Sequence, residues 1–196
     1  MRYLISIFVL SSFLASFTLL SELKSVEYKV DSKSTLTIEG TSNVHEWIAN
    51  ANKVTGNASF SFSDDGMIKI NNCEINIDAK SIKSTKGSIM DGKIYKALNT
   101  DAHPTITFKM KSLGEVSKTS NGFKAKVYGY LTIAGVTKVI GLDIAAKETA
   151  DGSYEITGSE KLKMTTYGID PPTAMMGAMT TGDEVTINFR TVLVQK

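Results

Sequence analysis

Residues 127–147 read VYGYLTIAGVTKVIGLDIAAK. Small and apolar residues alternate with others in the first half, so that Val127, Gly129, Leu131 and Ile133 share one side, and Tyr128, Tyr130 and Thr132 the other. The alternation breaks at Ala134-Gly135 and then resumes, with Ile140, Leu142 and Ile144 opposite Gly141, Asp143 and Lys147. Side chains of a strand point alternately to its two faces, so the stretch predicts an antiparallel hairpin that covers an apolar interior. The tight reversal predicts a positive φ at Gly135.

The same two-residue period recurs along the chain. It predicts further strands at residues 34–39, 54–63, 67–80, 105–110, 154–164 and 183–190. Asp64-Asp65-Gly66, residues 118–122 and Asp151-Gly152 are typical of turns between them. About eight antiparallel strands with one apolar face are most simply closed into an up-and-down β-barrel, because closure removes unpaired edges. The predicted fold is therefore all-β, with one or two short helices between strands.

Two stretches depart from the strand pattern. Apolar residues recur every three or four positions between Ser88 and Leu98, which predicts a helix. The charged residues of this helix are Asp91, Lys93 and Lys96. Together with Asp101 they are predicted to form a solvated face. Residues 165–182 are predicted to be irregular, because Pro171-Pro172 cannot pair regularly in a sheet. In that stretch Met175, Met176 and Met179 are interpreted as adaptable packing, with a lid over a lipid chain as the alternative.

The N-terminus is interpreted as a targeting segment. Residues 3–20 carry no charge and follow Met1-Arg2, the arrangement of a signal peptide. We expect a signal peptide at residues 1–21 and a folded domain at residues 22–196. An uncleaved membrane anchor is the alternative, because the apolar run is just long enough to cross a bilayer.

Composition excludes several classes of function. The 196-residue chain has a formal charge of +2, too near neutrality for an electrostatic nucleic-acid surface. Cys73 is the single cysteine, so no internal disulfide can form, and we interpret it as a small packing residue. The two histidines, His45 and His103, lack the spacing and cysteine partners of a zinc site. No nucleophile elbow or phosphate-binding loop occurs, so we expect no catalytic residue, no metal site and no cofactor.

Four short motifs resemble the YceI-like family. Gly129–Lys138 (GYLTIAGVTK) is similar to that family's most recognisable signature, and weaker similarities occur at residues 40–47 (GTSNVHEW), 103–108 (HPTITF) and 182–187 (GDEVTI). The order and spacing of these motifs extend the resemblance over roughly residues 27–194. The resemblance implies a lipocalin-like barrel, periplasmic or secreted after cleavage of the signal peptide, which binds a polyisoprenoid lipid.

Taken alone, each inward-facing residue is more simply a core residue, and the resemblance changes that interpretation to a pocket. The candidate ligand-binding residues are Trp47, Phe60, Phe62, Ile75, Ile77, Phe108, Leu131, Ile133, Leu142, Ile144, Ile187 and Phe189. Trp47 fits a core plug and an aromatic wall at the barrel mouth equally well. His45, beside it, is interpreted as a rim residue held by hydrogen bonds. Almost no polar position is expected on the inward faces.

The predicted function is that of an exported binding protein that sequesters or carries a polyisoprenoid or other long-chain amphiphile in the barrel. The alternatives are an enzyme acting on such a lipid and a purely structural barrel of the bacterial envelope. The expected partner is that lipid. An envelope membrane partner and a second copy of the chain are further candidates.

Overall fold

The computed structural model describes residues 24–63 and 68–196. The expected signal peptide and the Asp64-Asp65-Gly66 turn lie outside these described residues. The elements in chain order are β1 (Lys24–Val30), β2 (Thr35–Ser42), β3 (Trp47–Ala51), β4 (Val54–Phe62), β5 (Ile68–Asp78), η1 (Ala79–Ser81), β6 (Ile82–Ser84), α1 (Ser88–Leu98), β7 (Thr105–Thr119), β8 (Gly122–Ile133), β9 (Val136–Glu148), β10 (Tyr154–Lys163), η2 (Met164–Tyr167), β11 (Thr173–Ala174), η3 (Met175–Gly177) and β12 (Met179–Gln195).

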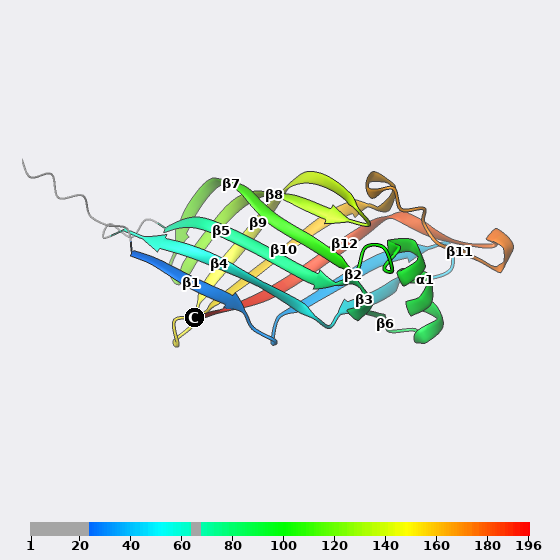
Figure 1. Cartoon of the computed structure of the whole chain (residues 1–196), viewed down its shortest axis with the longest axis horizontal. Helices are drawn as coiled ribbons and strands as arrows, with labels where there is room; N and C mark the ends of the chain where they lie inside the picture. The colour runs from blue at the N-terminus through cyan, green and yellow to red at the C-terminus, as the bar shows by residue number, and fades with distance from the viewer. Residues whose placement is uncertain (1–23, 64–67) are drawn as a thin grey trace, which may run out of the picture.

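These strands close an antiparallel ring (Figure 1). The ring runs β1-β4-β5-β7-β8-β9-β10-β12, and β12 returns to β1 where Tyr28 pairs with Gln195. The extra strands β2, β3 and β6 extend the sheet from the same edge of β12, beyond the point where β1 leaves it. The predicted fold class is therefore confirmed: an eight-stranded antiparallel barrel with extra strands and one helix.

Local sequence explains the central hairpin and the helix. Strands β8 and β9 pair along their whole length with Ile133 opposite Val136, and the two turn residues Ala134 and Gly135 have φ of 48° and 80°. The positive φ predicted at Gly135 is confirmed. Helix α1 spans the predicted Ser88–Leu98 and ends at Asn99, which has a left-handed conformation.

Several local predictions were wrong. A strand, β1, precedes the first predicted one, and β12 begins at Met179, inside the stretch expected to be irregular. Asp91 is not on a solvated face: it is buried, accepts a hydrogen bond from the Ser84 backbone N–H at 2.7 Å, and pairs with Lys83 at 3.3 Å. Met175 and Met176 are exposed rather than packed.

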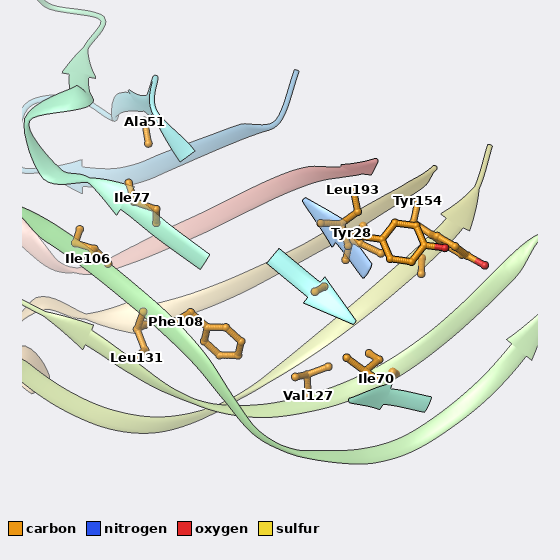
Figure 2. Packing of buried hydrophobic residues seen from close by; sticks show 14 of the residues in the cluster. Tyr28, Ala51, Ile70, Ile77, Ile106, Phe108, Val127, Leu131, Tyr154 and Leu193 are labelled. Atoms are coloured by element: carbon orange, nitrogen blue, oxygen red, sulfur yellow. The ribbon is translucent and has the colours of Figure 1, made fainter. Parts of the chain in front are cut away.

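One end of the barrel is closed by aromatic side chains. Phe60 and Phe123 are the largest fully buried side chains, and both contact Tyr154 with ring centroids 5.4 and 6.1 Å apart. Tyr28 meets Tyr154 edge-on at 5.6 Å; Figure 2 shows the two rings together, away from Ile77 and Ile106. Edge-to-face contacts of this kind add stability beyond the burial of area. These four residues form the aromatic plug.

The opposite end carries α1, β11 and the β2–β3 loop (Figure 1). The ring is less regular here. Pairing of β9 with β10 begins where Glu148 lies opposite Tyr154 and stops where Ile144 lies opposite Gly158. Pairing of β10 with β12 continues to Lys163, which lies opposite Glu184. Within residues 24–63 and 68–196, no helix is long and apolar enough to cross a membrane.

Candidate functional site

An apolar cavity occupies the barrel between the aromatic plug and the α1 end. Its larger section has a volume of about 180 Å³ and is lined by every strand of the ring except β1. Ten of the candidate residues line it: Phe60, Ile75, Ile77, Phe108, Leu131, Ile133, Leu142, Ile144, Ile187 and Phe189. An apolar cavity of roughly 150 Å³ stays dry and takes up benzene. The larger section can therefore accept a segment of hydrocarbon.

A smaller section of about 140 Å³ continues toward α1. The two sections share six aliphatic lining residues, namely Ile38, Ile82, Ile106, Ile133, Leu162 and Ile187. Helix α1 contributes Met90 and Ile94 to the smaller section, and Ile169 lines it as well. The exposed Lys163 also lines it, so this section reaches the protein surface. Together the sections form a tube that is blind at the aromatic plug.

Two glycines keep the tube wide. A Cβ on Gly129 would lie 2.4 Å from the Phe108 ring, and one on Gly158 would lie 2.4 Å from the Phe189 ring. The far end of each ring therefore occupies the space that a side chain on the neighbouring strand would fill. Small residues facing large ones allow a barrel interior to be shaped in this way.

Trp47 forms part of the wall at the open end. Its ring covers Gly40, where a Cβ would lie 2.3 Å away, and its indole N–H donates to the Thr41 carbonyl at 3.1 Å. The side chain is half-buried and lines the smaller section. His45 lies on the exposed β2–β3 loop, where its backbone N–H donates to Ser42 Oγ at 3.0 Å and its ring Nδ1 lies 2.8 Å from the Glu46 carbonyl oxygen. Of the two interpretations of Trp47, the geometry favours the aromatic wall.

Phe62 differs from the other candidates. It lies beside the aromatic plug, stacked on Tyr154 with ring centroids 6.4 Å apart, and lines neither section of the tube. The alternation in β4 predicts that Phe62 points inward, but it cannot show where along the barrel the packed end begins.

The larger section is lined by one charged side chain that was not predicted from the sequence. Glu160 on β10 lines the larger section, and it is the one ionisable carboxyl among the described lining residues of the tube. Burial raises its pKa, Asp143 acts in the same direction, and Lys126 acts against both. The signal was present in the sequence, because Glu160 belongs to the two-residue series Tyr154, Ile156, Gly158 and Leu162 on β10. The expectation of an almost wholly apolar interior was thus wrong at this position.

Cys73 lines the larger section as well. Burial raises the pKa of its thiol to about 12, and the charge of Glu74 contributes in the same direction. Such a thiol stays protonated at neutral pH and behaves as a small apolar residue. In the part of the chain that the structure describes, no group of three His, Cys, Asp or Glu side chains is placed to hold a metal ion.

The architecture matches a known family. The family model for the YceI-like domain matches residues 28–193, nearly the whole described barrel. The chain belongs to the YceI-like family. No curated protein matches it.

Solved structures of other YceI-like and related proteins share the fold at low sequence identity. BcnA from Burkholderia cenocepacia superposes with a TM-score of 0.63 at 18% identity, covering 83% of this chain and 98% of BcnA. A polyisoprenoid binding domain from Saccharophagus degradans, implicated in plant cell wall breakdown, gives 0.67 at 14% identity, covering 87% and 99%. The YceI protein of Campylobacter jejuni gives 0.55 at 22% identity, covering 76% and 84%. At these identities the likeness is one of fold.

Proposed function

We propose that this YceI-like protein is an exported binding protein that holds a polyisoprenoid or other long-chain amphiphile inside its barrel. The observation that carries the proposal is the tube itself, which is blind at the aromatic plug, open beside α1 and lined almost entirely by apolar side chains. Ligand sites are typically concave and apolar with a few placed polar groups. The shared fold with a polyisoprenoid binding domain supports the same ligand class.

The driving force is burial of the hydrocarbon chain. Each buried CH₂ contributes roughly 0.8 kcal/mol, and ordering the ligand and immobilising it offset part of this gain. A preformed tube lowers the ordering cost of binding because its walls do not rearrange. The rigid paired positions of Phe108 over Gly129 and Phe189 over Gly158 supply that preformed shape.

A binding role fits the cavity better than catalysis on a lipid. General acid–base catalysis needs an acid and a base that reach the same reacting group. Among the described lining residues, Glu160 is the one carboxyl, and the lysines Lys93 and Lys163 line the section nearer the surface. We infer that the protein is not an enzyme and needs no cofactor.

Export is part of the proposal and rests on the uncharged run at residues 3–20. We infer a periplasmic or secreted protein that is released after residue 21. The intact mass of the protein from its native compartment tests this inference. A membrane-pelleted species that still includes residues 1–20 would overturn it in favour of an anchor.

Ligand content tests the central claim. The mature protein, purified without detergent, is extracted with organic solvent, and the extract is compared by mass spectrometry with that of a Leu131→Trp variant. We expect an isoprenoid or long-chain species in the parent extract and less of it in the variant, since Leu131 lines the tube. If the parent yields no such species and takes up none when isoprenoids are added, a structural barrel is the better description.

A further inference from the structure

The tube has one buried polar group without a partner. Tyr167 is 2% exposed, lines the smaller section, and its hydroxyl has no hydrogen-bond partner in residues 24–63 and 68–196. A buried hydroxyl that gives up water without gaining a partner destabilises the fold, so native proteins rarely keep one without a reason. The hydroxyl is therefore a donor available to a guest.

The chain holds Tyr167 in place by specific contacts. The Asp183 carboxylate accepts hydrogen bonds from the Thr165 backbone N–H at 2.8 Å and from Thr165 Oγ1 at 2.7 Å. Gly168, with φ of 68°, ends the short helix η2, and the Ile169 N–H donates to the Met164 carbonyl at 3.1 Å. These contacts hold the turn at residues 164–169, in which Tyr167 and Ile169 are buried, so the ring of Tyr167 is held in a defined position.

Glu160 lines the adjoining, larger section of the tube. Its β10 neighbour Leu162 lines both sections, so Glu160 is adjacent to their junction. It faces Ile187 on β12, and it lies past Gly158, where pairing with β9 ends. Burial raises the pKa of Tyr167, and the charge of Glu160 raises it further. A carboxylate acceptor and a neutral hydroxyl donor thus line adjoining sections of one apolar tube, within electrostatic range of each other.

We propose that Glu160 and Tyr167 form the polar subsite of the tube, and that its ligand carries an uncharged hydroxyl at this depth. The ligand hydroxyl donates its proton to the Glu160 carboxylate and accepts a hydrogen bond from the Tyr167 hydroxyl, which satisfies all three groups. This inference rests on the proposed function and narrows it to a long-chain alcohol or phenol.

An anionic head group does not fit the subsite. A phosphate or carboxylate beside Glu160 would place two negative charges together in a poorly solvated site, which is strongly unfavourable. The lysines that line the tube, Lys93 and Lys163, belong to the smaller section, and Lys126 pairs with Asp143 at 2.7 Å. The competing arrangement is an anionic head held at the mouth by Lys93 and Lys163, with only hydrocarbon beside Glu160.

Three ligands with the same C20 isoprenoid chain separate these arrangements: the alcohol, the monophosphate and the hydrocarbon without oxygen. Each competes with a fluorescent isoprenoid for lipid-stripped mature protein. We expect the parent to bind the alcohol about three- to tenfold more tightly than the hydrocarbon, as one or two net hydrogen bonds allow. We expect the phosphate to bind at least about tenfold more weakly than the alcohol.

Two isosteric variants assign the effect to the subsite. Tyr167→Phe should weaken binding of the alcohol about three- to tenfold and leave binding of the hydrocarbon unchanged. Glu160→Gln should leave the affinity for the alcohol unchanged, because the amide oxygen still accepts a hydrogen bond. The same variant should bind the phosphate severalfold more tightly. The matched controls are Tyr154→Phe in the aromatic plug and Glu155→Gln on the outer face of β10, where Glu155 pairs with Arg190. Neither control should change the order of the three ligands.

The outcomes that overturn the inference differ from those that overturn the proposed function. The hydroxyl subsite is excluded if the parent binds the phosphate as tightly as the alcohol. It is also excluded if Tyr167→Phe weakens binding of the alcohol and of the hydrocarbon equally. Either result leaves the proposal of lipid binding intact. Failure of all three ligands to bind the parent removes both.

Discussion

The imidazole of His103 lies directly against Gly135: a Cβ at residue 135 would meet His103 Cε1 at 2.6 Å and Nε2 at 2.9 Å. Gly135 lies in the β8–β9 turn and His103 precedes β7, so the contact joins two motifs that are separate in the sequence. Gly135 also has φ of 80°. The glycine therefore meets two requirements, a left-handed backbone and room for the ring, whereas the sequence predicted only the first.

Gly135→Ala should destabilise the barrel more than the same change at Gly152. Both glycines have positive φ, 80° and 77°, but a Cβ on Gly152 has open space. We expect the left-handed backbone to cost about 1 kcal/mol of folding stability at Gly152. At Gly135 we expect crowding against His103 to cost roughly 1–3 kcal/mol more. Thermal unfolding of both variants measures the difference. His103→Ala should remove most of the extra cost in a double-mutant cycle, and equal melting temperatures for the two glycine variants would contradict the contact.

Leu131→Trp should fill the tube without unfolding the barrel. Leu131 lines the larger section, so the larger ring has a void to enter, and ligand binding should fall while the melting temperature changes little. Phe123→Trp is the control, because Phe123 is 1% exposed in the aromatic plug and has no such void. That change should cost on the order of 1–3 kcal/mol by overpacking. A Leu131→Trp variant as unstable as Phe123→Trp would show that the barrel is packed solid.

Glu160→Gln should stabilise the ligand-free protein at neutral pH. Burial, the largest cause, raises the pKa of Glu160 above its value in the unfolded chain, so the folded state holds the proton more tightly. Ionisation then costs folding free energy above the folded-state pKa, and this cost vanishes below the unfolded-state pKa. The melting temperature of the variant should exceed that of the parent near pH 7, and the difference should shrink toward about pH 4. A difference that stays constant or grows on acidification would exclude this origin, with Glu155→Gln as the control.

Asp91→Ala should lower stability by roughly 1–3 kcal/mol, because it leaves the Ser84 backbone N–H without its acceptor. Asp91→Asn should recover part of the loss, since its amide oxygen still accepts. The control is Asp101→Ala, because the Asp101 side chain is 89% exposed and its pair with Lys80 contributes little in water. Chemical denaturation of the three variants gives the comparison. Equal effects of Asp91→Ala and Asp101→Ala would mean that burial of Asp91 is unimportant.

The sequence by itself determined which faces of the strands point inward and where the chain turns. Alternation at Ile140, Leu142 and Ile144 and the positive φ at Gly135 are local properties, set by side-chain direction and backbone sterics over a few residues. The helix Ser88–Leu98 was predictable for the same reason, because spacing of three and four residues places apolar side chains on one face. These signals also sufficed for the fold class.

Only the tertiary structure decided how the interior is divided. Phe60 and Phe62 share an inward face of β4, yet Phe60 lines the tube and Phe62 stacks on Tyr154, a residue 92 positions further along the chain. Glu160 and Tyr167 line adjoining sections of one tube, although strand alternation places only the first of them. The register of distant strands fixes such relationships. A two-residue period records the face on which a side chain lies but not the side chains it meets across the barrel.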